Sequence, residues 1–394
     1  MVRKSKSVHS IALLIGGICA LSLAMGISRF GFTPIIPLMQ RDIGISNWEI
    51  AVMASANYLG YLMGAYISRQ PWFGQQGRAW IGVELAASVI LLLAMPLTLN
   101  AYIWTLLRLL AGFLSAILFV VASSVTLGQG RSDWAGYLYS GVGIGIAFTG
   151  IFTPVFDAIG GWAATWRGLA LGGSIFGTVA WYTLSKAPRP EAGDPGQKLI
   201  QAKFVRDHEW YVLLISYGLE GIGYIITATF IVQMIKAMPE LSHVANQSWV
   251  LIGLAAALST YLWAQIASKT SIKASLRLAY GLQALGIFLP VAIPSQISAL
   301  AGGVLFGGTF MGITSLTITL ASQMRPAAQR QAIGELTTVY ALGQIIGPIV
   351  AAYLQKSFSI SAPSLFAVVI LLFALLSLMT LNTHRKGGAA ACRM

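Results

Sequence analysis

Long apolar runs follow one another along this chain, and they restrict it to a helical membrane protein. Hydrophobic residues make up 56% of the chain and charged residues only 9%, whereas a soluble globular protein carries about 25% charged residues. Each run is close to the roughly 20 residues that a helix needs to cross a bilayer. The sequence therefore predicts an all-α integral membrane protein with twelve transmembrane helices, at approximately 11–38, 48–68, 79–97, 102–127, 134–156, 165–185, 209–235, 247–267, 275–293, 297–322, 332–355 and 363–381.

The 25 Lys and Arg residues are distributed unevenly between the two ends of these spans. If the N-terminus is placed in the cytoplasm, nineteen fall in cytoplasmic segments, four fall on the opposite side, and Arg29 and Arg108 lie within spans. Because cytoplasmic loops are rich in Lys and Arg, we expect a multi-pass protein of the cytoplasmic (inner) membrane with both termini cytoplasmic. The net charge of +13 then reflects topology, and we expect contact with the lipid bilayer but not with nucleic acid.

A polar segment after the sixth span divides the chain into two parts. Residues 186–207 contain three prolines and two glycines, which is typical of a linker. We predict an N-terminal six-helix half at 1–185, a cytoplasmic linker at 186–208 and a C-terminal six-helix half at 209–394. Faint repeats at a spacing of about 193–195 residues favour a duplicated six-helix unit. The paired positions are Gly141 with Gly334, Gly150 with Gly343, and Gly26 with Gly221.

Two halves around a site at mid-depth are typical of the major facilitator superfamily, which the chain resembles over its full length. Arg108-x3-Gly112 in the fourth span is similar to an Arg-x3-Gly signature of that superfamily. The eleventh span resembles the glycine-rich motif of its antiporters, with Gly334, Gly343, Gly347 and Pro348. The loop after the second span departs from the family pattern, since Ser68 replaces an acid there while Arg69 and Arg78 remain.

Three further segments are similar to a bacterial branch of the superfamily, the YbfB/YjiJ-like proteins. They read RFGFTPIIPLM from Arg29, ANYLGYLMGA from Ala56 and LEGIGYIITATF from Leu219. This resemblance implies a transporter with the major facilitator fold. It also implies a role for Arg108 in proton coupling or conformational change, and a conformational role for Gly112 and the glycine-rich motif.

Arg29 lies in the middle of the first apolar run, where a cation costs at least about 3 kcal/mol. We expect it to contact an anionic group of the substrate or to pair with a coupling carboxylate. The alternative is a structural Arg bound to backbone carbonyls where Pro34 and Pro37 disturb the helix.

Glu220 is the main candidate for a proton-carrying acid, because it lies inside the seventh span between apolar residues. The repeat places Glu220 and Arg29 on equivalent helices, so we expect them to meet across a central cavity in one conformation. Glu335, next to Gly334, is a second candidate for coupling, although it is closer to a span end. For Glu220 the alternative is a structural acid hydrogen-bonded to a neighbouring helix, and for Glu335 it is a solvated or helix-end carboxylate.

Several uncharged polar residues interrupt the apolar runs and are candidates for the lining of a binding site. Alternatively, they form interhelical hydrogen bonds, which contribute roughly 1 kcal/mol each. They are Asn57, Tyr58 and Tyr61 in the second span, Tyr224 and Thr227 in the seventh, and Gln344 in the eleventh.

These features together predict a secondary transporter that works by alternating access. The chain has no Gly-x4-Gly-Lys-Ser/Thr loop for ATP, and its few acids favour protons as the coupling ion. Intramembrane cations favour a small organic anion as substrate, while the glycine motif and apolar content keep open a proton-driven exporter of lipophilic or cationic drug-like compounds. An enzyme would need clustered catalytic His, Asp or Cys, and a channel would need a filter sequence. We expect neither, and we predict no cofactor, no metal site and a monomer.

Overall fold

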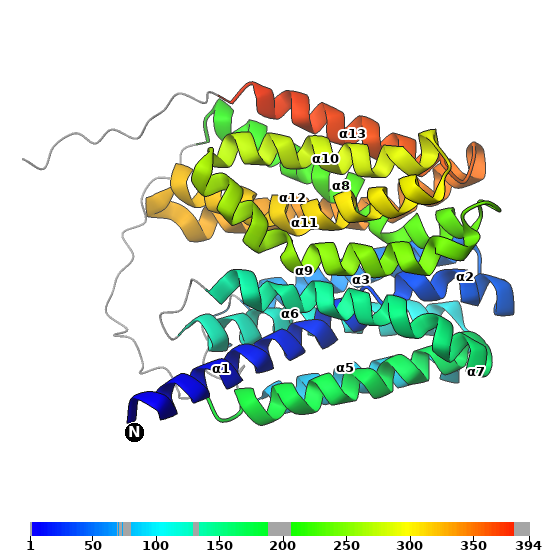
Figure 1. Cartoon of the computed structure of the whole chain (residues 1–394), viewed down its shortest axis with the longest axis horizontal. Helices are drawn as coiled ribbons and strands as arrows, with labels where there is room; N and C mark the ends of the chain where they lie inside the picture. Colours follow the sequence, from blue (N-terminus) through cyan, green and yellow to red (C-terminus); the bar gives the residue numbers. More distant parts are fainter. Residues whose placement is uncertain are drawn as a thin grey trace, which may run out of the picture.

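The computed structural model describes residues 2–68, 70, 73, 80–128, 134–187 and 206–381 of the chain. Every regular element within these ranges is a helix (Figure 1). The elements are α1 (Val2–Leu21), η1 (Ser22–Ile27), α2 (Phe32–Ile43), α3 (Asn47–Ile67), α5 (Ile81–Ala94), η3 (Met95–Leu97), α6 (Ala101–Leu127), α7 (Ala135–Leu184), α8 (His208–Lys236), η5 (Ser242–Val244), α9 (Ala245–Lys269), α10 (Ile272–Ala292), α11 (Gln296–Met324), η6 (Pro326–Ala328), α12 (Gln329–Ser357) and α13 (Ala362–Met379).

Ten helical segments among the described residues are long and apolar enough to cross a membrane, and residues 81–97 form a shorter apolar helix. The prediction of an all-α membrane protein is therefore confirmed. Two predicted spans, 134–156 and 165–185, lie within the single 50-residue element α7. The backbone leaves the helical conformation at Gly160 and Gly161, so α7 consists of two helical parts. The total of twelve crossings stays a prediction.

The bend in α7 is built from glycine conformation and a carboxylate cap. Gly161 has φ 65°, a left-handed value that a residue with a side chain adopts only at a cost. Asp42, at the end of α2, accepts a hydrogen bond from the N–H of Trp162 at 3.0 Å. This bond satisfies a backbone donor at the start of the second helical part. Arg41 joins the same corner through its ion pair with Asp157 of α7 at 2.6 Å.

The first apolar run is not one continuous helix. Between α1 and α2 lie the π-helix η1 and a turn over residues 28–31, which interrupt the chain at Arg29. The N–H of Phe30 bonds to the carbonyl of Met25, five residues back, and the N–H of Thr33 bonds to Phe30. The carbonyl of Arg29 is thereby left without the amide of Thr33 as its usual helical partner. Such π-type breaks in membrane helices frequently occur at functional sites.

The helices form two groups that lie side by side in Figure 1, α1–α7 below and α8–α13 above. The groups touch where α7 crosses α9 and where α3 meets α12, with the Ser55 hydroxyl donating to the Ile345 carbonyl at 2.7 Å. The N-terminus and the end of α13 lie on one side, which we call the terminal side. The opposite side is the distal side. Within the groups, Gly26 lies against Gly145 of α7 as Gly221 lies against Tyr340 of α12, so helix pairs at the predicted repeat spacing pack alike.

Candidate functional site

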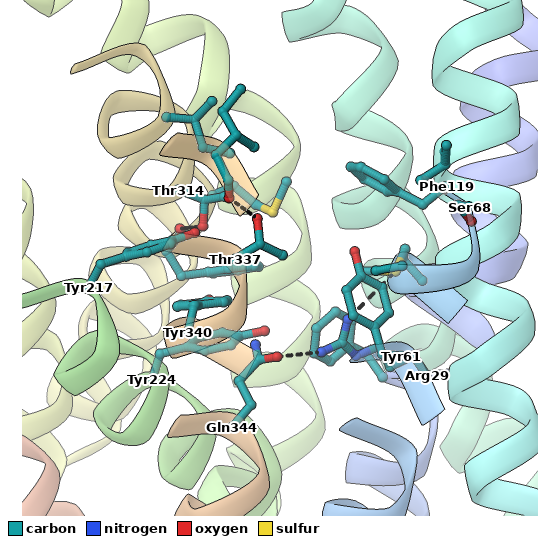
Figure 2. Close-up of a pocket in the computed structure, with 18 residues that line it drawn as sticks. Arg29, Tyr61, Ser68, Phe119, Tyr217, Tyr224, Thr314, Thr337, Tyr340 and Gln344 are labelled. Atoms are coloured by element: carbon teal, nitrogen blue, oxygen red, sulfur yellow. Dashed lines mark hydrogen bonds between the residues drawn. The ribbon is translucent and has the colours of Figure 1, made fainter. Parts of the chain in front are cut away.

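A cavity of about 320 Å³ lies between the two groups of helices. One wall comes from α8, α11 and α12, and the other from α3, α6 and the break after η1 (Figure 2). Its volume lies in the range of pockets for small organic molecules. Arg29 is the one charged residue among the described residues that line it. The labelled lining residues are Arg29, Tyr61, Ser68, Phe119, Tyr217, Tyr224, Thr314, Thr337, Tyr340 and Gln344.

Arg29 projects from the break in the first span to the base of this cavity. Its guanidinium carbon lies 4.3 Å from the ring centroid of Tyr61 and 4.7 Å from that of Tyr58, close enough for cation–π attraction. One terminal nitrogen donates to the Gln344 side-chain oxygen at 3.0 Å, across the boundary between the two groups of helices. The other lies 3.8 Å from the Met25 sulfur, the Tyr58 and Tyr61 side chains are within hydrogen-bonding reach of the guanidinium, and Nε has no partner. Arg29 therefore keeps Nε unused and one terminal nitrogen on a weak sulfur acceptor.

Arg108 forms hydrogen bonds with the backbone at Arg29. The side chain is 3% exposed, and its two terminal nitrogens donate to the carbonyls of Ser28 at 2.7 Å and Arg29 at 2.8 Å. These carbonyls lie at the break, where the helix leaves acceptors to be satisfied by other groups. Arg108 thus lies behind Arg29 and outside the cavity lining, and its contacts are those of a positioning residue.

Asn57 and Gly112 bring α3 and α6 together at this point. The Asn57 amide donates to the Arg108 carbonyl at 2.7 Å, so Asn57 does not line the cavity. A Cβ at position 112 would collide with the Asn57 carbonyl oxygen. Gly112 is therefore required for the close approach of the two helices, which sets the position of Arg108.

The C-terminal wall is a row of stacked aromatic rings that we call the aromatic wall. The Tyr217 and Tyr340 rings lie 4.4 Å apart with an interplanar angle of 11°. Tyr224 stacks on Phe310 at 5.1 Å and on Tyr340 at 6.1 Å, with angles of 21° and 15°. Figure 2 shows Tyr217, Tyr224 and Tyr340 on one side of the cavity, opposite Phe119 and Tyr61. Aromatic side chains therefore border the cavity on both sides.

Glu220 lies outside this cavity, in the interior of the C-terminal group. Its side chain is fully buried, and one carboxylate oxygen accepts from the Gln283 amide of α10 at 2.8 Å. The other oxygen has no partner. Among the described residues no ion pair joins Glu220 to Arg29 or to another cation. A buried carboxylate without a cation beside it is costly to keep ionised.

Glu335 lies near the terminal-side end of α12. It forms an ion pair with Arg206 at 2.6 Å and accepts from the indole nitrogen of Trp210 at 3.1 Å. These contacts join the segment that precedes α8 to α12. The ring of Trp210 also lies 5.6 Å from the guanidinium carbon of Arg325, which pairs with Asp207. Glu335 thus belongs to a charged cluster at the helix ends. The predicted cations Arg69 and Arg78 lie outside the described residues.

The glycines of the eleventh span pack α12 closely against α8. A Cβ at Gly343 would come within 2.5 Å of the Gly218 carbonyl, and one at Gly347 would overlap the Ile225 side chain. Pro348, inside α12, has no N–H to donate to the Gln344 carbonyl four residues earlier. Gly334 lies one residue before Glu335 and is buried, with its carbonyl accepting from Thr338 at 2.8 Å.

The distal side of the cavity is closed by polar contacts between the two groups of helices. The Gln233 amide of α8 donates to Gln40 at 2.9 Å and to Asn47 at 2.7 Å, and Gln40 donates to Asn47 at 2.8 Å. Nearer the cavity, the Thr33 hydroxyl donates to the Ala228 carbonyl at 2.7 Å. Thr33 and Gln233 are buried, whereas the lining residues toward the terminal side, such as Ser68 and Thr337, are half-buried. The cavity is thus sealed on the distal side.

The structure brings together five of the seven residues that the sequence predicts for substrate contact: Arg29, Tyr58, Tyr61, Tyr224 and Gln344. Tyr58 lies under Arg29 rather than in the lining, and Thr227 is buried with its hydroxyl donating to the Gly223 carbonyl. The sequence prediction missed Tyr217, Tyr340, Phe310 and Phe119. A signal for two of them exists, because Tyr217 and Tyr340 lie seven and four residues before Tyr224 and Gln344, on the same helical faces.

The comparisons with known proteins agree with this architecture. The family described as "Uncharacterised MFS-type transporter YbfB" matches residues 21–379. Among solved structures, the nucleoside transporter NupG superposes with a TM-score of 0.71 at 13% identity, covering 95% of this chain and 100% of the other. A mutant form of the same transporter superposes with a TM-score of 0.72 at 14% identity, covering 94% and 99%. At this identity the likeness concerns the fold. No curated protein sequence matches the chain.

Proposed function

The chain belongs to the family of MFS-type transporters described as YbfB, and we propose that it moves a small organic anion across the membrane by proton-coupled alternating access. The observation that carries the choice of an anion is Arg29. It is buried at the base of the cavity, it has an unpartnered Nε, and none of the described lining residues is acidic. A carboxylate at this position fills donors that the protein itself leaves open. A lipophilic cation, the alternative cargo, would meet Arg29 without a compensating acid.

Proton coupling is assigned to Glu220 in this proposal. The residue has the burial and the unfilled oxygen of a carboxyl group that holds a proton, and Gln283 keeps the other oxygen in place. It lies on α8, the helix that also carries Tyr217 and Tyr224 of the aromatic wall. A change in its charge acts on the cavity through movement of α8. Glu335 and Arg108 are then positioning residues of the same cycle.

The transport cycle that we propose treats α1–α7 and α8–α13 as the two moving halves. Twelve crossings result if α7 contributes two and the short helix at 81–97 contributes one. With both termini in the cytoplasm, the cavity faces the cytoplasm in this structure and the distal seal faces outward. Rocking of the halves breaks the Arg29–Gln344 and Gln233 contacts and opens the distal side.

The test is uptake into proteoliposomes together with thermal stabilisation of the purified protein by a panel of carboxylates. A ligand at 100 times its dissociation constant stabilises by about 2.7 kcal/mol. Arg29→Gln should abolish stabilisation by anions, whereas Arg167→Gln, at an exposed position of α7, should not. Glu220→Gln should leave anion binding intact but remove the dependence of uptake on an imposed proton gradient. Glu240→Gln, at an exposed position, is the matched control. Anion uptake that survives in Arg29→Gln would contradict the proposal.

A further inference from the structure

Arg29 lies beside aromatic faces, and this combination specifies more than the charge of the cargo. We propose, on the basis of the anion transport inferred above, that the substrate is a planar aromatic carboxylate. Its carboxylate binds Arg29, and its ring lies between the aromatic wall and the rings of Tyr61 and Phe119. The proposal rests on the lining of the cavity and on the unfilled donors of Arg29.

The aromatic wall is a stack of nearly parallel rings. Interplanar angles of 11°, 15° and 21° join Tyr217, Tyr340, Tyr224 and Phe310, so the faces of Tyr340 and Tyr224 are covered by their neighbours. These two rings therefore border the cavity with their edges (Figure 2). The edge of an aromatic ring is positive and is attracted to the negative face of another ring, so the wall favours an aromatic guest in edge-to-face contact. A saturated anion has no such face to present.

The opposite wall offers aromatic rings that are held in place. Phe119 is stacked on Tyr139 at 5.4 Å with an interplanar angle of 6°, so a second helix fixes its orientation. Tyr61 is held against the Arg29 guanidinium at 4.3 Å. Figure 2 shows the labelled Tyr61 and Phe119 facing Tyr340 and Tyr217 across the open space. A ring in that space contacts aromatic groups on both sides.

Gln344 occupies the position on Arg29 that the carboxylate takes. Its side-chain oxygen accepts a hydrogen bond from Arg29 at 3.0 Å. This neutral amide oxygen lies where a carboxylate oxygen of the substrate would bind. The neighbouring donor contacts a methionine sulfur at 3.8 Å, a weak acceptor. A carboxylate, which accepts on two oxygens, replaces both contacts with stronger ones. Binding therefore breaks the one described side-chain bond that joins Arg29 to the C-terminal group.

The experiment compares ligands matched in charge and size on the purified wild-type protein. The aromatic acids are benzoate, 1-naphthoate and indole-3-acetate. The saturated partners are cyclohexanecarboxylate and decahydronaphthalene-1-carboxylate, and the uncharged partners are benzamide and 1-naphthamide. We expect at least one aromatic acid to bind roughly threefold to tenfold more tightly than its saturated partner, the difference typical of one aromatic ring pair. Its amide should bind at least tenfold more weakly than the acid.

Variants separate the failure of this inference from the failure of the proposed function. Tyr340→Leu should reduce the preference for aromatic over saturated acids, whereas Tyr353→Leu, 63% exposed on the same helix, should not. If saturated acids bind as tightly as aromatic ones and binding still requires Arg29, the aromatic class is wrong and anion transport stands. If no acid binds, or if the amides bind equally well, both proposals fail. The wild-type comparison decides the matter even if a variant does not fold.

Discussion

At the scale of single residues, the two intramembrane arginines have different roles. Arg29 faces the cavity with unfilled donors, while Arg108 uses its two terminal nitrogens on the carbonyls of Ser28 and Arg29. The fork of a guanidinium places a separate nitrogen at each acceptor, whereas an ammonium would have to donate to both carbonyls from a single nitrogen. Arg108 therefore controls the site without contacting its contents.

Replacing Arg108 by Lys tests this difference. The charge is kept, but a single shorter-reaching nitrogen replaces the two that now bond the Ser28 and Arg29 carbonyls, and a buried carbonyl left without a good partner costs about 1–3 kcal/mol. We expect a lower thermal stability and a loss of anion binding, both measured on the purified protein with the acids used above. Arg167→Lys is the control at an exposed position. Unchanged anion affinity in Arg108→Lys would show that the break in the first span does not depend on this fork.

Gln344→Glu tests whether a carboxylate is the preferred partner of Arg29. The substituted side chain places an anionic acceptor where a neutral one now lies at 3.0 Å. Charge-assisted hydrogen bonds are roughly twice as strong as neutral ones, so we expect a more stable protein that binds free carboxylates at least about tenfold more weakly. Calorimetric titration measures the affinity, with Gln296→Glu at the exposed start of α11 as control. Wild-type affinity in Gln344→Glu would exclude Arg29 as the anion contact.

At the scale of helices, the contact between α7 and α9 is made by glycines on both sides. A Cβ at Gly253 would lie 2.7 Å from the Gly143 carbonyl and 2.8 Å from the Ala147 Cα. These atoms belong to the backbone of the other group of helices. Backbone atoms cannot rotate away as a side chain can, so a methyl group at position 253 would force the two helices apart.

Gly253→Ala should therefore destabilise the protein by about 1–3 kcal/mol and slow transport, because the two groups no longer close on each other as tightly. Gly308→Ala is the matched control on α11, where the added methyl would meet only the Ala255 side chain at 3.9 Å. Thermal unfolding and initial uptake rates measure the two effects. Equal behaviour of the two variants would show that the crossing tolerates separation.

The sequence predicts helices better than it predicts their irregularities. Apolar length located nearly all the spans, because a bilayer demands about 20 residues of helix whatever the packing. The break at residues 28–31 was not located, although Pro34 and Pro37 lie close by, since the π-type bonds of η1 precede both prolines. Asn57 was assigned to the cavity, but the rotation of α3 about its axis turns it toward α6. Helix rotation depends on packing partners that one sequence does not reveal.

Aromatic residues of the cavity were missed for a similar reason. Tyr and Phe in a membrane helix face lipid, neighbouring helices or a cavity with equal ease, so composition does not distinguish them. Arg29 and Gln344 were found because a cation or an amide inside an apolar run requires a partner. The polar half of the site was therefore predictable, and the aromatic half became visible only when α8, α11 and α12 were placed side by side.

At the scale of the whole molecule, a small number of polar contacts closes the distal side of the structure. The distal seal consists of the Gln233 bonds to Gln40 and Asn47 and the Thr33 bond to Ala228. All of these cross between the two groups of helices. Because each bond contributes only about 1 kcal/mol, the proposed transport cycle can break this seal at a modest cost in free energy.

Gln233→Leu removes two of the bonds while keeping the side-chain size similar. A loss of about 2 kcal/mol changes the ratio of the two states roughly thirtyfold toward the distal-open form. Spin labels are attached at Trp48→Cys, at the start of α3, and at Glu240→Cys, in the turn that follows α8, both of which are exposed. Cys19 and Cys392 are replaced by Ser in this background. Opening of the distal side is measured as a longer distance between the two labels. Gln296→Leu, also on the distal side but within one group, is the control.

Since an aromatic acid displaces Gln344 from Arg29, adding benzoate should lengthen the distance between the labels further in Gln233→Leu. A distance distribution identical to that of the wild type, with or without benzoate, would mean that the amide cluster does not hold the distal side closed.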